Sequence, residues 1–390
     1  MRIGIDALFV IPGFSGGIET YARNLVAGLA GLDRSLELVV FVRPSAVDHG
    51  WGPAPRVRLV PVSVPEVHGG AFAAVQAWLP VLARRYRLDV LHHTFCYATL
   101  AWSRAQLVTI HDLITHDYYH REHDLVHRPL RARVRRGVFV RGARGATRVI
   151  TPTATVAEEV ASSLGVDRWR ISVTHEAAKS PAEVRDSDAR LARLGLRDGG
   201  FVFTVSRFLP HKNLETLVRA HLRSGIDRDL AIAGVAQFPD NAQPVIESIR
   251  REIAESPRGD RIKLLGHVAE SDLAALYRGA SAFAFPSLME GFGLPPLEAM
   301  HAGTPVLASD IPVHREVLRD GALFVAPRDI DGMARALERI CEDQALRQQL
   351  AASSRRVVDG YSWARTARDT FDAYRAALAT VGRTGHARAA

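Results

Sequence analysis

Cysteine is scarce in this sequence. Cys96 and Cys341 are the only two among 390 residues, and their separation fits neither a metal-binding motif nor a disulfide framework. This scarcity excludes a small secreted fold held together by disulfides. It favours two free thiols in the core of a protein from a reducing compartment, the cytoplasm.

Long apolar runs are also absent. No stretch approaches the roughly 18 apolar residues that a membrane-spanning helix requires. The chain begins with MRIGIDALFV, which is typical of a first β-strand and lacks the basic and apolar segments of a secretory signal. We therefore expect a protein without a secretory signal or a membrane span.

Negative charge is outweighed by positive charge, and most of the excess is arginine. The formal net charge is +8, while 47% hydrophobic and 24% charged residues are ordinary values for a soluble globular protein. A basic balance can indicate a nucleic acid, an anionic membrane surface or an acidic substrate as partner. The length predicts roughly two to three domains.

Strands and helices alternate along the first part of the chain. Residues 17–32 place Ile18, Tyr21, Leu25 and Leu29 at helical spacing. Short apolar runs predict strands at 1–10, 36–44, 89–95, 107–113 and 148–153. Such an alternation predicts a parallel sheet covered by helices on both faces.

A polar stretch at residues 176–200 interrupts this alternation and predicts a linker with a short helix. A second alternation follows from residue 201. We predict an α/β protein in which two doubly wound, Rossmann-like parallel sheets face an interdomain cleft. The first domain would span residues 1–180, the second 198–360, and a closing helix over 361–380 would return to the first domain.

Two carboxylates frame the segment EGFGLPPLE. Glu290 follows a predicted strand over 282–285, and Glu298 lies eight residues later. Pro295 and Pro296 predict the start of a helix, which places Glu298 in its first turn. Glycine-rich backbone and helix N-termini bind anionic groups, and carboxylates accept hydroxyl groups. The segment therefore predicts a nucleotide-sugar site; the structural alternative is a solvated Glu290 and a Glu298 that stabilises the helix dipole.

The segment PSLMEGFGLPPLEAMHAGTPVLAS resembles the E-x7-E signature of the family 4 retaining glycosyltransferases, which have the GT-B fold. VSRFLPHKNLETLVRAH, VTIHDL and GGIETYARNL extend the resemblance to essentially the whole chain. It implies that the first domain faces the acceptor and the second binds a nucleotide-sugar donor. Glu298 would hold ribose hydroxyls and Glu290 hexose hydroxyls, while Phe292, Gly293 and Leu294 would contact the donor through their backbone.

Two cations, Arg207 and Lys212, follow the strand that begins at residue 201. At the carboxyl end of that strand they could neutralise a diphosphate as it departs. An arginine and a lysine five residues apart are by themselves more typical of a surface. The resemblance implies that this pair binds the donor diphosphate.

Other positions take their role from the resemblance alone. Gly16 and Gly17 would lie over the sugar diphosphate, although such a glycine pair is also common in tight turns. His111 would contact the donor hexose, with a structural histidine as the alternative. The backbone at Val268 would read the nucleotide base.

Acidic strings that could hold a metal occur three times as Asp-x-Asp, at residues 186–188, 227–229 and 329–331. Each lies in a polar connection rather than after a core strand, so we interpret them as solvated acids. We expect no metal or other cofactor, because cations and helix N-termini already neutralise the diphosphate.

Arginine is concentrated at residues 128–148, where Leu130, Val134 and Val138 form a narrow apolar stripe. One interpretation is a solvated helix packed on the first sheet. The other is attraction to anionic headgroups or to a pyrophosphate-linked lipid acceptor. No interleaved aromatic residues or known module support a nucleic acid partner.

These observations predict a retaining, metal-independent hexosyltransferase. It would move a hexose, for which we favour mannose from GDP-mannose, to a hydroxyl of a saccharide or lipid-linked acceptor, as in mannosyl- and rhamnosyltransferases of polysaccharide or glycolipid biosynthesis. The predicted catalytic residues are His111, Arg207, Lys212 and Glu290. The alternatives are a GT-B nucleotide-sugar epimerase and a non-catalytic polyanion-binding protein. We expect a cytoplasmic location and leave open a peripheral position on the inner face of the membrane.

Overall fold

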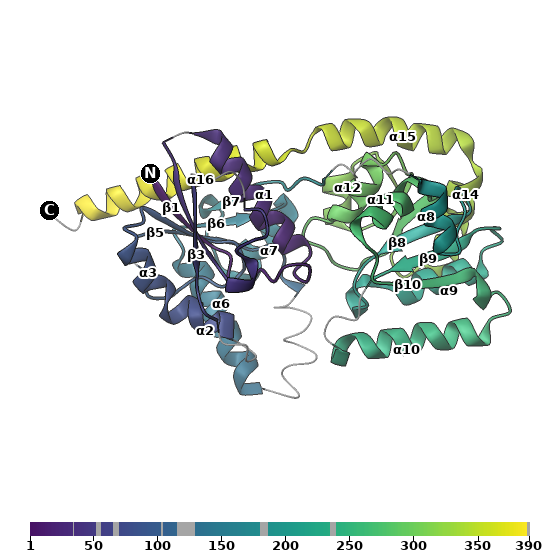
Figure 1. The fold of residues 1–390 in the computed structure, drawn as a ribbon, viewed down its shortest axis with the longest axis horizontal. Coiled ribbons are helices and arrows are strands. Elements are labelled where there is room, and N and C mark those ends of the chain that lie inside the picture. The colour runs from purple at the N-terminus through teal and green to yellow at the C-terminus, as the bar shows by residue number, and fades with distance from the viewer. Residues whose placement is uncertain are drawn as a thin grey trace. The chain divides into compact units, whose positions relative to one another are not determined.

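The computed structural model describes residues 1–33, 35–51, 56–64, 70–102, 104–114, 129–179, 186–234 and 239–387. The chain divides into two compact units (Figure 1). The first unit comprises Met1–Glu176 and Ser362–Ala390, and the second comprises Ala177–Tyr361. The chain therefore passes between the units twice, once after Glu176 and once after Tyr361.

A seven-stranded sheet forms the centre of the first unit, in the order β3-β2-β1-β4-β5-β6-β7. All neighbouring strands run parallel. The sequence did not predict the edge strands β3 and β7, because β3 is mostly solvent-facing and β7 has only three residues. The strands are β1 (Arg2–Asp6), β2 (Glu37–Val42), β3 (Val57–Pro61), β4 (Val90–His93), β5 (Ala105–Thr109), β6 (Arg148–Thr151) and β7 (Ile171–Val173).

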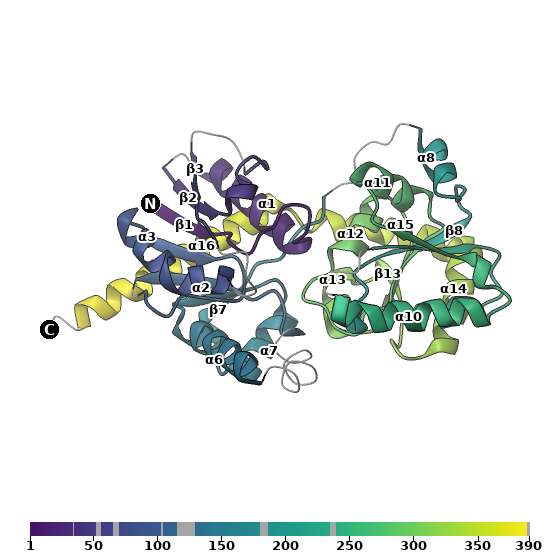
Figure 2. The same cartoon turned by 60° about the horizontal axis from the view of Figure 1, so that its bottom comes forward.

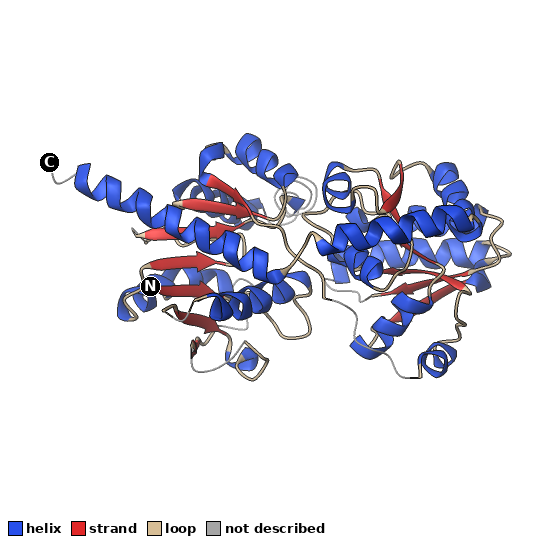
Figure 3. Ribbon diagram, turned by 90° about the horizontal axis from the view of Figure 1, so that it is seen from above, coloured by secondary structure: helices blue, strands red, loops and turns tan. Residues whose placement is uncertain are grey.

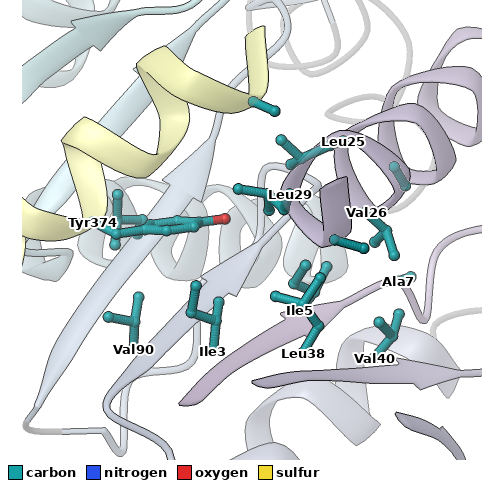
Figure 4. Close-up of a cluster of buried hydrophobic side chains, with 14 of the residues drawn as sticks. Ile3, Ile5, Ala7, Leu25, Val26, Leu29, Leu38, Val40, Val90 and Tyr374 are labelled. Carbon is teal, nitrogen blue, oxygen red and sulfur yellow. The ribbon is translucent and has the colours of Figure 1, made fainter. Parts of the chain in front are cut away.

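Helices cover both faces of this sheet (Figure 3). On one face, α1 (Gly17–Leu32) and α16 (Trp363–Ala387) share a buried apolar cluster with the strands. Figure 4 shows Tyr374 projecting from α16 over Ile3 and Val90, with Leu25 and Leu29 of α1 beside it. The opposite face carries α2 (Gly70–Ala77), α3 (Leu79–Arg85), α6 (Pro129–Gly145) and α7 (Ala154–Leu164).

The second unit contains a six-stranded parallel sheet in the order β10-β9-β8-β11-β12-β13. Its strands are β8 (Phe201–Val205), β9 (Asp229–Ala233), β10 (Ile262–Gly266), β11 (Ala282–Phe285), β12 (Val306–Ser309) and β13 (Ala322–Val325). The short apolar run predicted over 282–285 is thus β11, and all four of its residues are buried.

Helices also flank the second sheet. On one face, α9 (Leu214–Arg223), α10 (Pro239–Glu255) and α14 (Ile330–Glu342) form one apolar cluster with the strands. Leu346 and Leu350 of α15 (Gln344–Asp359) belong to the same cluster. Elsewhere around the sheet lie α8 (Ser187–Arg193), α11 (Glu270–Gly279), α12 (Leu294–His301) and α13 (Pro312–Leu318). Figures 1 and 2 both show α8 beside α11, with which it is in contact.

Each sheet reverses its strand order at one point. In the first, β1 lies between β2 and β4; in the second, β8 lies between β9 and β11. The predicted α/β class with two doubly wound, Rossmann-like sheets is confirmed, whereas a cleft shared by the two units stays a prediction. In such sheets, ligands bind beyond the carboxyl ends of the strands at the reversal, which is called the switch point. Among the described residues, no helix is long and apolar enough to cross a membrane.

Candidate functional site

Lys212 and Glu290 form an ion pair at the switch point of the second unit. β8 leads into a turn at Pro210–Lys212, and β11 leads to Glu290. Lys212 Nζ lies 2.6 Å from Glu290 Oε1 and 5.6 Å from the centre of the Phe285 ring. The side chains of Lys212 and Glu290 remain 17% and 9% exposed. The two charges are therefore largely buried without being sealed from solvent.

Asn213 ties together the loops that carry this pair. Its Nδ2 donates hydrogen bonds to the carbonyl oxygens of Pro286 and Pro327, at 2.9 and 2.6 Å. Its φ of 57° lies in the left-handed region, which asparagine adopts more readily than most residues. A backbone bond from Leu288 N to His211 O, 2.7 Å long, joins the same two loops. These bonds hold the two charged side chains side by side.

The surroundings of Glu290 favour its ionised form. Burial is the largest single influence on the Glu290 carboxyl and would raise its pKa. The charge of Lys212 and its hydrogen bond, with further contributions from neighbouring groups, together outweigh burial, so the pKa lies below its ordinary value. Burial, followed by the charge of Lys212, lowers the pKa of the neighbouring His211 to about 4. At neutral pH the site therefore holds a carboxylate beside an uncharged imidazole.

Glu298 lies in the second turn of α12, so the prediction of the first turn is wrong. The helix begins at Leu294 rather than at the two prolines, and Gly293 before it has a φ of 89°, which favours glycine. Tyr277 Oη of α11 donates a hydrogen bond to Glu298 Oε2, at 2.7 Å. Burial raises the pKa of Glu298, and the bond from Tyr277 opposes this rise only in part.

Other predicted residues lie at the same carboxyl edge of the second sheet. Arg207 follows β8 by two residues, and Val268 follows β10 by two residues. Phe292 is buried and packs edge-on against Tyr361, with 5.5 Å between the ring centres. The loop EGFGL is therefore anchored on the last residue of the second unit.

Gly16 and Gly17 lie in the first unit, where the loop after β1 meets α1. Gly16 has a φ of 55° and a ψ of −126°, a conformation accessible mainly to glycine, and Gly17 is the first residue of the helix. Ser15 Oγ accepts a hydrogen bond from Ile11 N at 2.7 Å and donates one to Phe9 O at 3.1 Å. These two bonds close the loop that delivers the glycine pair.

His111 follows β5 and is bonded through both ring nitrogens. Nδ1 lies 2.9 Å from Glu176 Oε1, and Nε2 lies 3.0 Å from Thr94 O. Burial is the largest single influence on His111 and would lower its pKa. The hydrogen bond and charge of Glu176, the bond to Thr94 O and the charge of Asp112 together outweigh burial, so the pKa is raised. We expected Glu176 in a linker; it is instead buried in the first unit, because it pairs with His111.

Two further histidines, His92 and His93, end β4 beside His111, and the sequence analysis singled out neither. His93 Nδ1 lies 2.8 Å from Asp6 Oδ2, and its Nε2 lies 3.3 Å from Thr99 N. His92 Nδ1 lies 2.7 Å from the hydroxyl of Tyr374 on α16. Burial lowers the pKa of His92 to about 3. The switch point of the first unit is thus occupied by a buried Asp6–His93 pair.

Acids of two of the three Asp-x-Asp strings, those at 227–229 and 329–331, have partners within the protein. Asp227 Oδ1 lies 2.6 Å from Arg261 Nη2. Asp329 accepts a hydrogen bond from Gly332 N and thereby caps α14. Within the ranges that the structure describes, no group of three or more histidine, cysteine or acidic side chains is arranged to hold a metal ion.

The arginine-rich segment forms α6. Phe139 and Ala143 are buried in the cluster that includes α7, whereas Val134 is 51% exposed. The predicted apolar stripe is therefore wrong at Val134, because the helix turns a different side toward the sheet; the side chain of Leu130 and residue 128 lie outside the described residues. Among the residues of this helix whose exposure the structure describes, the exposed arginines are Arg133, Arg136, Arg141 and Arg144.

Two family models match the two halves of the chain: "Glycosyltransferase Family 4" over residues 15–177 and "Glycosyl transferases group 1" over residues 190–357. A mannosyltransferase of Mycolicibacterium hassiacum, described as an MMP alpha-(1->4)-mannosyltransferase, is 30% identical over 76% of this chain and 73% of its own. The chain belongs to glycosyltransferase family 4.

Further relatives of this family 4 member are also described as mannosyltransferases. The O-antigen chain mannosyltransferase B of Escherichia coli is 25% identical over 92% of this chain and 96% of its own. The O-antigen chain mannosyltransferase RfbU of Salmonella typhimurium is 31% identical, but the match spans only about half of each chain, 49% and 50%. Among solved structures, the sucrose-phosphate synthase of Thermosynechococcus elongatus is similar in fold, with a TM-score of 0.78, 22% identity, and coverage of 97% of this chain and 100% of its own.

The structure brings only some of the predicted residues into contact. Lys212 and Glu290 form a pair, and Arg207 and Glu298 lie at the same edge of the second sheet. His111 and the glycine pair belong to the first unit, so their convergence with the other residues stays a prediction. Sequence reasoning missed three supporting residues, namely Asn213, Tyr277 and Glu176. Asn213 stood within the quoted motif VSRFLPHKNLETLVRAH, whereas Glu176 had no local signal because His111 lies 65 residues away.

Proposed function

We propose that this family 4 member is a retaining, metal-independent glycosyltransferase. It transfers a hexose, mannose from GDP-mannose in our preferred assignment, to a hydroxyl of a saccharide or lipid-linked acceptor. The observation that carries the proposal is the Lys212–Glu290 ion pair at the switch point of the second unit. The mannosyltransferase relatives support the choice of sugar.

In this reaction the bond between the sugar C1 and the diphosphate oxygen breaks, and the acceptor oxygen bonds to C1 from the same face. The acceptor proton passes to the departing phosphate oxygen, so no side chain has to act as a nucleophile. Arg207 and Lys212 stabilise the negative charge that develops on the diphosphate. Glu290 accepts hydrogen bonds from hexose hydroxyls and keeps Lys212 in position before the donor arrives.

The remaining residues bind the donor. Glu298 accepts from the ribose hydroxyls, with Tyr277 holding its other carboxyl oxygen, and the backbone at Val268 contacts the base. Gly293 and its neighbours Phe292 and Leu294 present their backbone to the sugar. From the first unit, Gly16 and Gly17 approach the diphosphate and His111 lies beside the hexose. Closure of the two units on the donor would exclude the water that otherwise hydrolyses it.

The decisive assay is transfer by the purified protein from a panel of nucleoside diphosphate sugars to saccharide acceptors in the presence of EDTA. We expect a product whose anomeric configuration, read by NMR, equals that of the donor. An inverted anomer would exclude the retaining mechanism, and loss of transfer in EDTA would exclude metal independence. Conversion of the donor in the absence of any acceptor would instead identify an epimerase.

The identity of the donor can be determined from the melting temperature, without an acceptor. A bound ligand raises the melting temperature by mass action, so GDP and GDP-mannose should raise it more than other nucleotides at equal concentration. A larger rise with UDP or dTDP compounds would reassign the donor. Salt-sensitive binding of any polyanion, with no response to nucleotide sugars, would favour the non-catalytic alternative.

We propose a cytoplasmic location at the inner face of the membrane, supported by the exposed arginines of α6. Vesicles containing anionic lipid should retain the protein at low salt and release it at high salt, because exposed charges are screened. Replacing Arg133, Arg136 and Arg141 with glutamine should weaken this retention. Equal binding to neutral vesicles would contradict the electrostatic interpretation.

A further inference from the structure

The two hydrogen-bond partners of His111 are both acceptors. A backbone carbonyl oxygen cannot donate, so His111 Nε2 must carry the hydrogen that points to Thr94 O. A carboxylate also only accepts, so the hydrogen bond between Nδ1 and Glu176 Oε1 needs a second hydrogen. The His111–Glu176 pair therefore holds one proton more than a neutral imidazole beside a carboxylate. Because the ordinary pKa of histidine exceeds that of glutamate, this proton belongs to the imidazole ring. His111 is then an imidazolium beside a carboxylate.

The neighbouring His93 offers a contrast within the same sheet. It also faces a carboxylate, that of Asp6, through Nδ1. Its Nε2, however, lies near Thr99 N, which is a donor, so this nitrogen must accept and carries no hydrogen. His93 is therefore a neutral ring protonated on Nδ1, although its carboxylate lies at nearly the same distance, 2.8 Å against 2.9 Å for His111. The second partner, not the carboxylate, distinguishes the two histidines.

The groups packed around His111 support a single charged pair. Asp112 is the other charged group whose field reaches the ring. Tyr21 packs edge-on at 4.7 Å between ring centres, and burial raises the pKa of its hydroxyl, so it is neutral. His92 is neutral as well at pH 7, because burial lowers its pKa to about 3. Among the described residues, Glu176 is thus the direct counter-ion of the ring.

Glu176 is also the last residue of the first unit before the chain crosses to the second. The preceding residue is held in place as well, because Thr366 Oγ1 of α16 donates a hydrogen bond to His175 O at 2.6 Å. Thr366 lies shortly after the chain returns to the first unit at Ser362. The carboxylate that faces His111 is therefore attached to a fastened segment rather than to a free linker.

We propose that Glu176 is a positioning residue that holds His111 as an imidazolium at the carboxyl edge of the first sheet. The functional part rests on the proposed function, in which the donor sugar lies beside His111. Because both N–H groups point to protein acceptors, His111 acts on the sugar diphosphate through a fixed positive charge and not through an N–H hydrogen bond. Glu176 both orients the ring and keeps that charge.

The charge state can be tested without any activity measurement. In protein labelled with ¹⁵N-histidine, the two ring nitrogens of an imidazolium have nearly equal shifts, whereas those of a neutral ring are widely separated. At pH 7.5 we expect His111, assigned with His111→Gln, to be an imidazolium and His93 to be neutral. In Glu176→Gln the amide can donate to Nδ1, so His111 should become neutral. Glu158→Gln, which removes a 70% exposed carboxylate from the same unit, should change neither ring.

A neutral His111 in the wild-type protein, or an imidazolium that persists in Glu176→Gln, would overturn the proposed charge state. This holds even if no nucleotide sugar proves to be a donor, so the test does not depend on the proposed function.

The kinetic arm tests the positioning role. We expect Glu176→Gln to lower kcat about tenfold at pH 7.5 while the donor KM changes less than threefold, and Glu176→Asp to recover part of the loss. The basic limb of the pH profile should move to lower pH in Glu176→Gln, because the ring loses its proton more readily. Suppose that the NMR result is as expected but that kcat and the pH profile of Glu176→Gln equal those of the wild type. The imidazolium would then stand, but its role in transfer would be overturned.

Discussion

Each unit places a pair of acidic and basic side chains at the switch point of its sheet. The six strands of the second sheet follow the order of the first six strands of the first sheet, yet the two pairs differ in their surroundings. In the first unit, the side chains of Asp6 and His93 are 2% and 0% exposed. Their other polar atoms accept hydrogen bonds from the backbone, Asp6 Oδ1 from Leu8 N and His93 Nε2 from Thr99 N. In the second unit, Lys212 and Glu290 keep partial exposure beside a glycine-rich loop. The same fold thus carries a fully buried pair, Asp6–His93, which we call the closed pair, and a partly exposed pair, Lys212–Glu290, which we call the open pair. The loops that follow the strands differ between the two units and set this exposure.

The largest effect on activity should come from the open pair. Lys212→Ala and Glu290→Ala should each lower kcat by about 10² to 10³, the range seen when a group that stabilises transition-state charge is removed. Circular dichroism and the melting temperature should show that both variants remain folded. Glu252→Ala, in the more exposed Arg219–Glu252 pair of the same unit, is the matched control and should retain full activity. Near-normal transfer by both site variants would refute the proposed site.

Substitution in the closed pair should lower the stability of the protein. Asp6→Ala removes the acceptor of two buried donors, His93 Nδ1–H and Leu8 N–H. Leaving such groups unsatisfied costs about 1–3 kcal/mol each, so we expect the free energy of unfolding to fall by about 3 kcal/mol. Urea denaturation measures this change, with Glu158→Gln as the surface control. A loss below about 1 kcal/mol would mean that the pair is not structural.

Acid should weaken both units through their buried neutral histidines. The pKa of His92 is lowered to about 3, and those of His211 and His221 to about 4, in each case first by burial. The unfolded chain therefore binds more protons than the folded one between pH 6.5 and about 4, and stability falls as pH falls in that window. Each histidine contributes up to about 1.4 kcal/mol per pH unit.

His111 should act in the opposite direction. Its folded pKa is raised, so its contribution to stability is complete below about pH 6.5 and is lost as pH rises through the folded value. Urea midpoints from pH 4 to 9 should therefore show an acid limb that is smaller in His92→Gln and a basic limb that is absent in His111→Gln. A pH-independent midpoint would contradict both assignments.

The two units also differ in how much of them the sequence predicts. In the second unit, Glu290 and Glu298 lie on one loop and the helix after it, so glycine, proline and the buried strand 282–285 reveal the motif locally. In the first unit, the partner of His111 comes from a polar segment that resembles a linker, and only the folded chain brings Glu176 to it. The fold class follows from hydrophobic alternation, whereas edge strands such as β7 are too short to give a periodic signal.

The smallest expected effect concerns the support of Glu298 by Tyr277. Tyr277→Phe removes a hydroxyl that donates to Glu298 Oε2, so the carboxylate loses one bond and its pKa, already raised by burial, rises further. In the proposed complex this should weaken nucleoside diphosphate binding about fivefold, the equivalent of roughly 1 kcal/mol for one hydrogen bond, with kcat nearly unchanged. Titration calorimetry at pH 7.5 and pH 5.5 should show a larger loss at the lower pH, where more of the carboxyl is protonated. The control is Tyr361→Phe, which removes another buried hydroxyl. That hydroxyl donates to Val317 O rather than to Glu298, so its removal should leave the affinity unchanged. Equal losses of affinity in the two variants would indicate general destabilisation instead of a contact between Glu298 and the nucleotide.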